Sequence, residues 1–407
     1  MAGRVLTLEE AVEIAIEQQP QIQARLSDYA AARFRVDQAL APLLPQITGT
    51  WTAARAQSVT GAGTTTGVDT GRTRPVWTDT TVARISLSQL LFDFGKTLAA
   101  TEAARKLQDV ALEDVELQRQ LIALAVKEAY TNMLFAQRLI RVNEQALQRA
   151  ELNLRSARGF FEVGTRPRSD VARAEVDVAN ARVDVIRARN AERLARVALN
   201  TAMGIDVDTP TAIQDNLVYE PVTLDRAALR AEAVRLRPEM RQARLRLEAA
   251  EAQQRQAFRS FFPDITGGGF YGATRAEMHE IWELNLALTW PLFDGGGRIA
   301  RYREARANVE AAEARVRATE LDILREVEQA QLTVAEAEER IQAAQTAVAS
   351  AQENFRLAQG RFDAGVGTIL ELTDAQLALT QAQNLETQAL ADYRIALYRL
   401  DRARGRR

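Results

Sequence analysis

Two carboxylates in the last tenth of the chain are the residues whose type and spacing could do chemistry. Glu371 and Asp374 are three positions apart, so they share one face of a helix if this segment is helical. An exposed acidic pair attracts cations. The alternative is that both residues simply begin a helix, where the macrodipole favours negative charge. The residue pattern leaves both interpretations open.

Catalytic chemistry finds no support elsewhere in the sequence. There is no cysteine, and the single histidine, His279, falls in a predicted loop between strands. No glycine-rich phosphate loop is present, and Glu and Arg at helical spacing are typical of solvated or interhelical surfaces. The formal net charge is -2 with the charges interspersed, which disfavours nucleic-acid binding. We therefore expect no enzyme, no cofactor, no metal site and no nucleic-acid partner.

A long helix must position the acidic pair. From 298 to 360 the sequence contains no proline, and apolar or small residues recur every seven positions, beginning with Tyr302, Val309, Val316 and Ile323 and continuing as alanines from Ala330. A seven-residue repeat predicts a helix packed along its length against other helices. At ~1.5 Å per residue such a helix is far longer than a compact domain.

The same plan occurs twice in the chain. Moving back 201 positions places Phe161 and Gly164 where Phe362 and Gly365 stand. We therefore read the chain as a tandem repeat. The first repeat is 1–203, with a long helix at 96–160 and a return helix at 170–203. A connector follows at 204–224, and the second repeat, 225–407, has its long helix at 298–360 and its return helix at 371–402.

Four strands are predicted, at about 47–57, 78–91, 265–274 and 281–292. The clearest alternates strictly, with a polar face and an apolar face that carries Trp282, Leu284, Leu286, Leu288 and Trp290. A half-buried strand of a soluble sheet also alternates. However, the two tryptophans are about 26 Å apart along a strand, close to the spacing of aromatic girdles in an outer-membrane barrel. We therefore expect this face to contact membrane lipid.

Four strands are too few to close a membrane barrel, because the smallest barrels have about eight and lipid tolerates no open edge. The chain must oligomerise if it spans a membrane. No apolar run is long enough for a transmembrane helix. No signal peptide is visible, which indicates either a cytosolic protein or a mature form whose start is not the natural one.

Taken together, these residues resemble the TolC-like outer-membrane efflux family over essentially the whole chain. The resemblance rests on the doubled plan, the start LTLEEAVEIAIEQQP, the strand starts LLPQI and FFPDI, the two LFD-Gly junctions, and the tips FEVGT and FDAGVGT. It implies a mainly α protomer with a small β part. Three protomers would form a twelve-helix α-barrel joined to a twelve-stranded transmembrane β-barrel, four strands coming from each chain. The location implied is the Gram-negative outer membrane, extending through the periplasm.

The resemblance also implies roles for residues at the two helical tips. Glu371 and Asp374 match positions that line the closed periplasmic entrance, and Asp170 at the first tip is a further candidate. Phe362 and Gly367 match positions where some members carry Tyr and Arg that help to hold the entrance shut; Arg166 could substitute here. The tip residues expected to dock a periplasmic adaptor are Phe161, Gly164, Thr165, Arg166, Phe362, Gly365 and Gly367.

The function expected is a passive exit channel of a tripartite efflux pump or type I secretion system. Its partners would be two further copies of the chain, a periplasmic adaptor, outer-membrane lipid and, indirectly, an inner-membrane pump. The alternative is a soluble coiled-coil scaffold or adaptor protein without a pore, which the absent signal peptide and the interspersed charge would suit. The sequence does not identify the cargo, because the wall of a duct need not contact it specifically.

Overall fold

The structure, a computed structural model, describes residues 5–60, 74–222, 225–274 and 279–407. It confirms the expected class, mainly helical with a small sheet part. Contacts divide the chain into two compact units. Unit 1 comprises Met1–Asp28, Leu112–Gln242 and Arg317–Arg407, and unit 2 comprises Tyr29–Ala111 and Ala243–Val316. Each unit takes residues from both sequence repeats.

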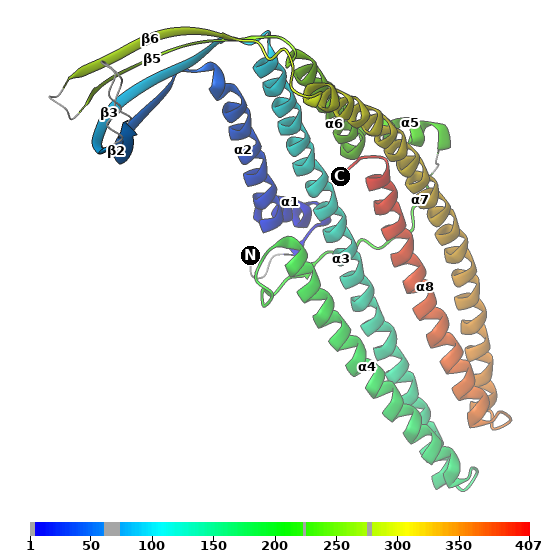
Figure 1. Ribbon diagram of the computed structural model, residues 1–407. Coiled ribbons are helices and arrows are strands. Elements are labelled where there is room, and N and C mark those ends of the chain that lie inside the picture. Colours follow the sequence, from blue (N-terminus) through cyan, green and yellow to red (C-terminus); the bar gives the residue numbers. More distant parts are fainter. Residues whose placement is uncertain (1–4, 61–73, 223–224, 275–278) are drawn as a thin grey trace, which may run out of the picture. The chain divides into compact units, whose positions relative to one another are not determined.

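Unit 2 contains a four-stranded antiparallel sheet in the order β2-β3-β5-β6 (Figure 1). The strands are β2 (Gln46–Thr60), β3 (Arg74–Phe92), β5 (Asp264–Thr274) and β6 (Glu280–Thr289). β6 ends three residues before the expected position 292, because Pro291 has no N–H to donate to a neighbouring strand. Most of the long loop expected after the first strand, at 61–73, lies outside the described residues.

Two helices of 67 residues each, α3 (Lys96–Glu162) and α7 (Gly297–Asp363), follow the sheet strands. Each is about 100 Å long at the rise of an α-helix. A short 3-10 turn, η1 (Ala41–Leu43), precedes β2, and α2 (Pro20–Leu40) and α6 (Pro238–Arg259) precede the two strand pairs. The long helices begin and end within three residues of the positions expected from the heptad pattern.

The LFD-Gly motif works as a strand-to-helix junction. In the first copy Asp93 accepts hydrogen bonds from the backbone N–H of Gly95 at 3.0 Å and of Thr97 at 2.7 Å, so it caps α3. Gly95 has a positive φ of 80°, which glycine adopts without strain. In the second copy Asp294 accepts from the N–H of Arg298 at 3.0 Å. The same chemistry thus starts both long helices.

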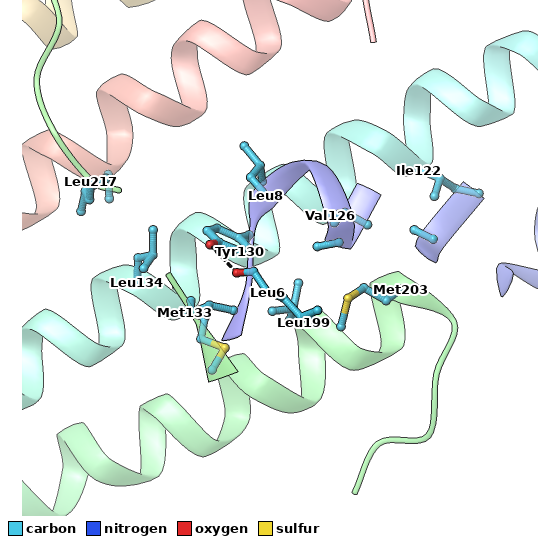
Figure 2. Close-up of a cluster of buried hydrophobic side chains, with 14 of the residues drawn as sticks. Leu6, Leu8, Ile122, Val126, Tyr130, Met133, Leu134, Leu199, Met203 and Leu217 are labelled. Carbon is cyan, nitrogen blue, oxygen red and sulfur yellow. Dashed lines mark hydrogen bonds between the residues drawn. The ribbon is translucent and has the colours of Figure 1, made fainter. Parts of the chain in front are cut away.

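Unit 1 is held by a hydrophobic core around the middle of α3, shown in Figure 2. Tyr130 is buried there; its hydroxyl lies 2.9 Å from the carbonyl oxygen of Gln214 and 3.1 Å from that of Leu6. Burial raises the pKa of Tyr130 to about 12. The connector expected at 204–224 is therefore more than a linker: it supplies β4 (Ala212–Ile213), which pairs in parallel with β1 (Val5–Leu6).

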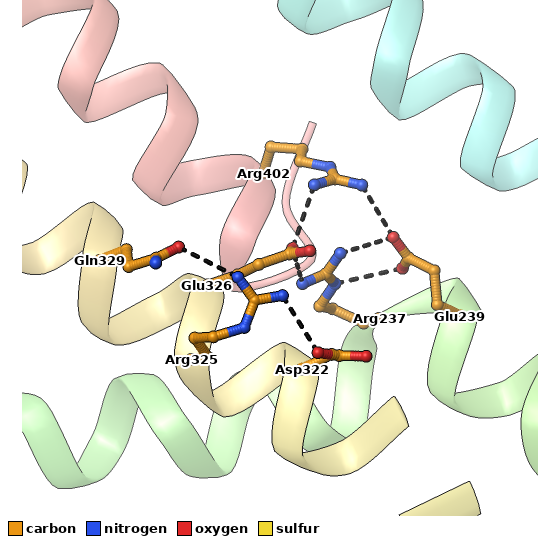
Figure 3. Close-up of polar contacts among 7 residues, drawn as sticks. All are labelled: Arg237, Glu239, Asp322, Arg325, Glu326, Gln329 and Arg402. Carbon is orange, nitrogen blue, oxygen red and sulfur yellow. Dashed lines mark hydrogen bonds and ion pairs between the residues drawn. The ribbon is translucent and has the colours of Figure 1, made fainter. Parts of the chain in front are cut away.

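Four further helices complete unit 1: α1 (Leu8–Gln18), α4 (Arg168–Met203), α5 (Arg226–Leu236) and α8 (Ile369–Ala403). A closed ring of four charged side chains joins α6, α7 and α8 to the turn before α6 (Figure 3). We call Arg237, Glu239, Glu326 and Arg402 the ion ring. The Arg237 side chain is only 2% exposed, and it donates to both Glu239 and Glu326. Arg402 donates to the same two carboxylates at 2.9 and 3.2 Å.

Candidate functional site

The two tip turns have the same backbone design. Between α3 and α4, Gly164 has a φ of 77°, and the N–H of Thr165 donates to the carbonyl of Phe160 at 3.0 Å. Between α7 and α8, Gly365 has a φ of 80°, and the N–H of Val366 donates to the carbonyl of Arg361 at 3.0 Å. Space is open around both glycines, so their backbone conformation, not crowding, requires glycine.

Apolar side chains support the tips from inside. Phe362 is only 1% exposed and packs with Ile369 and Leu372, while Phe160 approaches it edge-on with a centroid distance of 5.6 Å. Phe161, by contrast, is 43% exposed. Of the two phenylalanines expected to present a docking surface, only Phe161 therefore offers its ring to a partner; Phe362 holds the turns in place from beneath.

Arg166 connects the first tip to the second. Its Nη2 donates to the carbonyl oxygen of Gly367 at 2.6 Å, and its guanidinium carbon lies 4.5 Å from the ring centre of Phe362. On its other side Nη1 lies 3.6 Å from a carboxylate oxygen of Asp170. A Cβ atom at position 367 would lie 2.9 Å from the backbone nitrogen of Phe362. Glycine thus allows the close approach of the chain that brings this carbonyl to Arg166.

The carboxylates expected at the entrance have different surroundings. Thr368 caps α8 by accepting from the N–H of Glu371 at 3.2 Å, so Glu371 lies in the first turn. Glu371 and Asp374 are exposed, and Glu371 has an ion-pair partner in Arg361 at 3.5 Å. Asp170 is mostly covered because Arg166 lies against it. Within one chain, Glu371 and Asp374 therefore lie together at the start of α8. Among the described residues, Asp170 has an ion pair with Arg166 and no contact with either of these two carboxylates.

The sheet has one apolar and one polar face. The register Ile47↔Leu87↔Gly269↔Leu284 places these four positions on the same side. We define the apolar face by these apolar residues on that side: Ile47, Trp51, Ile85, Leu87, Ile265, Tyr271, Trp282, Leu284, Leu286 and Leu288. Most of these side chains are exposed, Leu284 by 83% and Leu286 by 72%. Farther along β2 and β3 the same side carries two charged residues, Arg55 and Asp79, which form an ion pair with each other at 3.3 Å.

The opposite face, which we call the polar face, carries Thr48, Thr50, Arg84, Ser86, Ser88, Glu283 and Asn285. On it Arg84 donates to the hydroxyl of Thr50 at 3.2 Å. The sequence singled out only the apolar residues of the last strand. The sequence analysis missed Ile47, Trp51 and Ile85, because Gly49 and Ala83 place small residues between them and weaken the alternation. A tryptophan at position 51, within a predicted strand, was the one signal that could have identified this second apolar stripe.

Trp290, the last of the expected lipid-facing residues, follows β6 rather than lying in it. Its indole N–H donates to the carbonyl of Phe261 at 3.1 Å. Across the described parts of the chain, no helix has the length and apolar character needed to cross a membrane. Within the same residues, no group of three or more His, Asp or Glu side chains could hold a metal ion.

Comparison with known proteins gives matches along nearly the whole chain. The family described as outer membrane efflux protein matches residues 11–205 and 229–406. The alkaline protease secretion protein AprF of Pseudomonas aeruginosa is 26% identical over 415 residues, covering 97% of this chain and 83% of that protein. The pyoverdine export outer membrane protein OpmQ of Pseudomonas putida is 24% identical over 389 residues, covering 94% of this chain and 82% of that protein.

Solved structures share the fold. The outer-membrane channel OprN superposes with a TM-score of 0.82 at 22% identity, covering 98% of this chain and 89% of that one. The match extends over both units and over both sequence repeats.

Proposed function

This chain belongs to the outer membrane efflux protein family, and on that premise we propose that it is the exit channel of an efflux pump or secretion system in the outer membrane. One observation carries the proposal: a sheet with an exposed apolar face, a polar face and two edge strands, β2 and β6, that each pair on one side only within the described chain. Such a sheet suits a barrel wall between lipid and water.

The apolar face would contact lipid and the polar face would line the pore. Contact of Leu and Trp side chains with water is unfavourable. An exposed apolar patch of this kind therefore marks a surface that contacts a membrane or another protein. Trp282 and Trp290 would lie at the two membrane interfaces, where tryptophan is enriched, with Leu284, Leu286 and Leu288 between them. This assignment uses the lipid-facing residues expected from the sequence.

Two further copies of the chain would complete the channel. Sheet edges need partners in lipid, because every backbone N–H and C=O must be paired there. Independent support comes from α4, which exposes an apolar stripe at helical spacing: Val176, Val183, Ile186, Leu194 and Val197. A homotrimer would pair the edges and cover such stripes with neighbouring protomers, consistent with the expected shared α-barrel and β-barrel.

Glu371 and Asp374 would form the acidic ring of the periplasmic entrance. Three copies would contribute six carboxylates, which would attract cations. Their exposure at the start of α8 supports this placement. The contribution of Asp170 would be smaller, because Arg166 lies against its carboxylate and offsets its charge.

The tips would dock the periplasmic adaptor. Phe161, Gly164, Thr165 and Gly365 are exposed at the turns and would provide the contact surface, with Phe362 fixing the turns from beneath. The names of two relatives refer to protease secretion and to pyoverdine export. We therefore propose a passive conduit that releases cargo delivered by an inner-membrane pump and performs no catalysis itself.

Purification followed by bilayer recording tests this function. The protein should require detergent, migrate as a heat-sensitive trimer on a gel, and produce discrete conductance steps in a planar lipid bilayer. A soluble monomer without conductance would overturn the proposal and favour a coiled-coil scaffold instead.

A further inference from the structure

The junction between β3 and α3 contains a strained residue. Phe94 has a φ of 55°, and among the described residues it is the one position other than glycine with a positive φ. A bulky side chain in this backbone conformation is an outlier and costs free energy. At the junction between β6 and α7 the residue directly after the capping Asp is instead Gly295, which has a φ of 67° without that cost. The first junction therefore keeps a phenylalanine where glycine would be relaxed.

Two aromatic rings contact Phe94. It stacks on Phe262 with the ring centroids 5.2 Å apart and an interplanar angle of 22°, and Phe92 meets it edge-on at 4.8 Å. Phe258, on α6, meets Phe262 edge-on at 5.9 Å. Because Phe262 lies between α6 and β5, the ring of Phe94 joins the β3–α3 junction to the α6–β5 junction. These contacts need the side chain that glycine lacks.

Two polar contacts tie the same pair of junctions. Nη1 of Arg259, at the end of α6, donates to the carbonyl oxygen of Gly95 at 2.7 Å. Nζ of Lys96 donates to a carboxylate oxygen of Asp264 at 2.6 Å. Hydrogen bonds to charged groups are stronger than neutral ones. The first residues of α3 are therefore fixed to the start of β5, and this surrounding structure can hold Phe94 in its strained conformation.

The junction between β6 and α7 is packed more loosely. Gly295 and Gly296 have open space around them, and Phe293, which precedes the capping Asp as Phe92 does, is 88% exposed. Both long helices nevertheless begin with the same kind of Asp cap. The cap therefore does not require a phenylalanine, and the strain at Phe94 goes with its ring contacts.

We propose that Phe94 is a positioning residue that fixes the direction in which α3 leaves the sheet. Its stack on Phe262 selects one arrangement of the β3–α3 junction at the expense of backbone strain. A residue without the ring would relieve the strain and let α3 adopt several directions. This inference rests on the proposed channel function, in which the sheet and the long helices are successive parts of one duct and their relative direction determines how those parts join.

Spin labels report the direction of α3 relative to the sheet. The chain has no cysteine, so labels can be attached to Leu44→Cys, just before β2, and to Leu107→Cys on α3, both at exposed positions of unit 2. Labelled protomers are diluted into unlabelled trimers, so that each distance arises within one chain. The urea midpoint of each variant in lipid vesicles is measured alongside, because it separates a change of direction from a loss of stability.

Phe94→Gly removes the ring and the strain together. We expect it to raise the population of other α3 directions about 2- to 10-fold, the factor that corresponds to one aromatic pair, and so to broaden the distance distribution. The urea midpoint should change little, because relief of the strain offsets the lost contacts. Phe94→Tyr keeps the stacked ring and should give the parent distribution. The matched control, Phe293→Gly, removes an exposed ring from the second junction and should also match the parent.

A parent-like distance distribution in Phe94→Gly would overturn the proposal, whatever the urea midpoint, because Phe94 would then be an ordinary packing residue. Equal broadening in Phe293→Gly would also overturn it, since the loss of any ring near the sheet would then suffice. If Phe94→Gly does not assemble, Phe94→Leu, which is apolar but cannot stack, takes its place with the same expected broadening. Absence of conductance in the parent protein would refute the channel function instead, and the label distances would still decide whether Phe94 fixes α3.

Discussion

Leu286→Arg and Asn285→Arg form a matched pair that tests the two faces of the sheet. The residues are neighbours in β6, and the register places Leu286 opposite Gly267 on the apolar face and Asn285 opposite Gly268 on the polar face. Both substitutions add the same charged group at nearly the same depth. Any difference between them must therefore come from what each face contacts.

The size of the effect follows from the position of Leu286. It is four residues from Trp282 and four from Trp290, about 13 Å from each along a strand, which places it near the middle of the apolar band. Arginine on the lipid face at the membrane midplane costs about 2–4 kcal/mol, and the cost falls toward the interfaces. Asn285 donates to the carboxylate of Glu283 at 3.0 Å. An arginine at position 285 would meet the same carboxylate, so its cost should stay within about 0.5 kcal/mol.

Refolding into lipid vesicles across a urea gradient measures the difference. The midpoint for Leu286→Arg should shift to lower urea, or trimers should fail to insert, while Asn285→Arg should insert like the parent and alter conductance. Equal tolerance of both substitutions would show that β6 does not lie in lipid. A cost confined to Asn285→Arg would show that the faces are reversed.

Three further predictions concern the tips and the ion ring. Glu371→Gln combined with Asp374→Asn should reduce cation selectivity, measured as the reversal potential across a KCl gradient; unchanged selectivity would make both carboxylates ordinary helix-start residues. Gly365→Val should disfavour the positive-φ turn and reduce efflux while trimers remain in the membrane, and normal transport would move adaptor docking elsewhere. Glu239→Gln should destabilise the fold by about 3 kcal/mol in urea unfolding, because it weakens the pairing of the buried guanidinium in the ion ring, whereas Glu353→Gln, at an exposed pair with Arg356, should leave the urea midpoint close to that of the parent. Burial disfavours the charged form of Glu239, but the arginines of the ion ring outweigh this effect and hold the pKa of the Glu239 carboxyl below its ordinary value. The stability that Glu239 contributes should therefore be present above the unfolded-state pKa of 4.5. It should be lost as the pH falls through the lower folded-state pKa.

Local patterns in the sequence were sufficient for the long helices, the strands and the tip turns. The heptad stripe beginning at Tyr302 predicts a helix because one face must be apolar at every second turn. Strict alternation from Trp282 predicts a strand for the analogous reason. Gly164 and Gly365 mark turns because only glycine adopts their backbone conformation at no cost. Each of these signals depends on residues within a few positions of one another.

Tertiary structure alone decided which distant residues meet. The sequence named Arg166 as a possible substitute at the tip, but its partner at Gly367 is a backbone carbonyl, which no residue type reveals. Likewise Arg237 looks like any other arginine of a charged helical chain until Glu326, 89 residues away, closes the ion ring around it. An Arg beside a Glu at helical spacing is usually solvated. Only the packing of separate helices determines whether such a pair is buried, because burial depends on what covers the pair and not on its spacing along the chain.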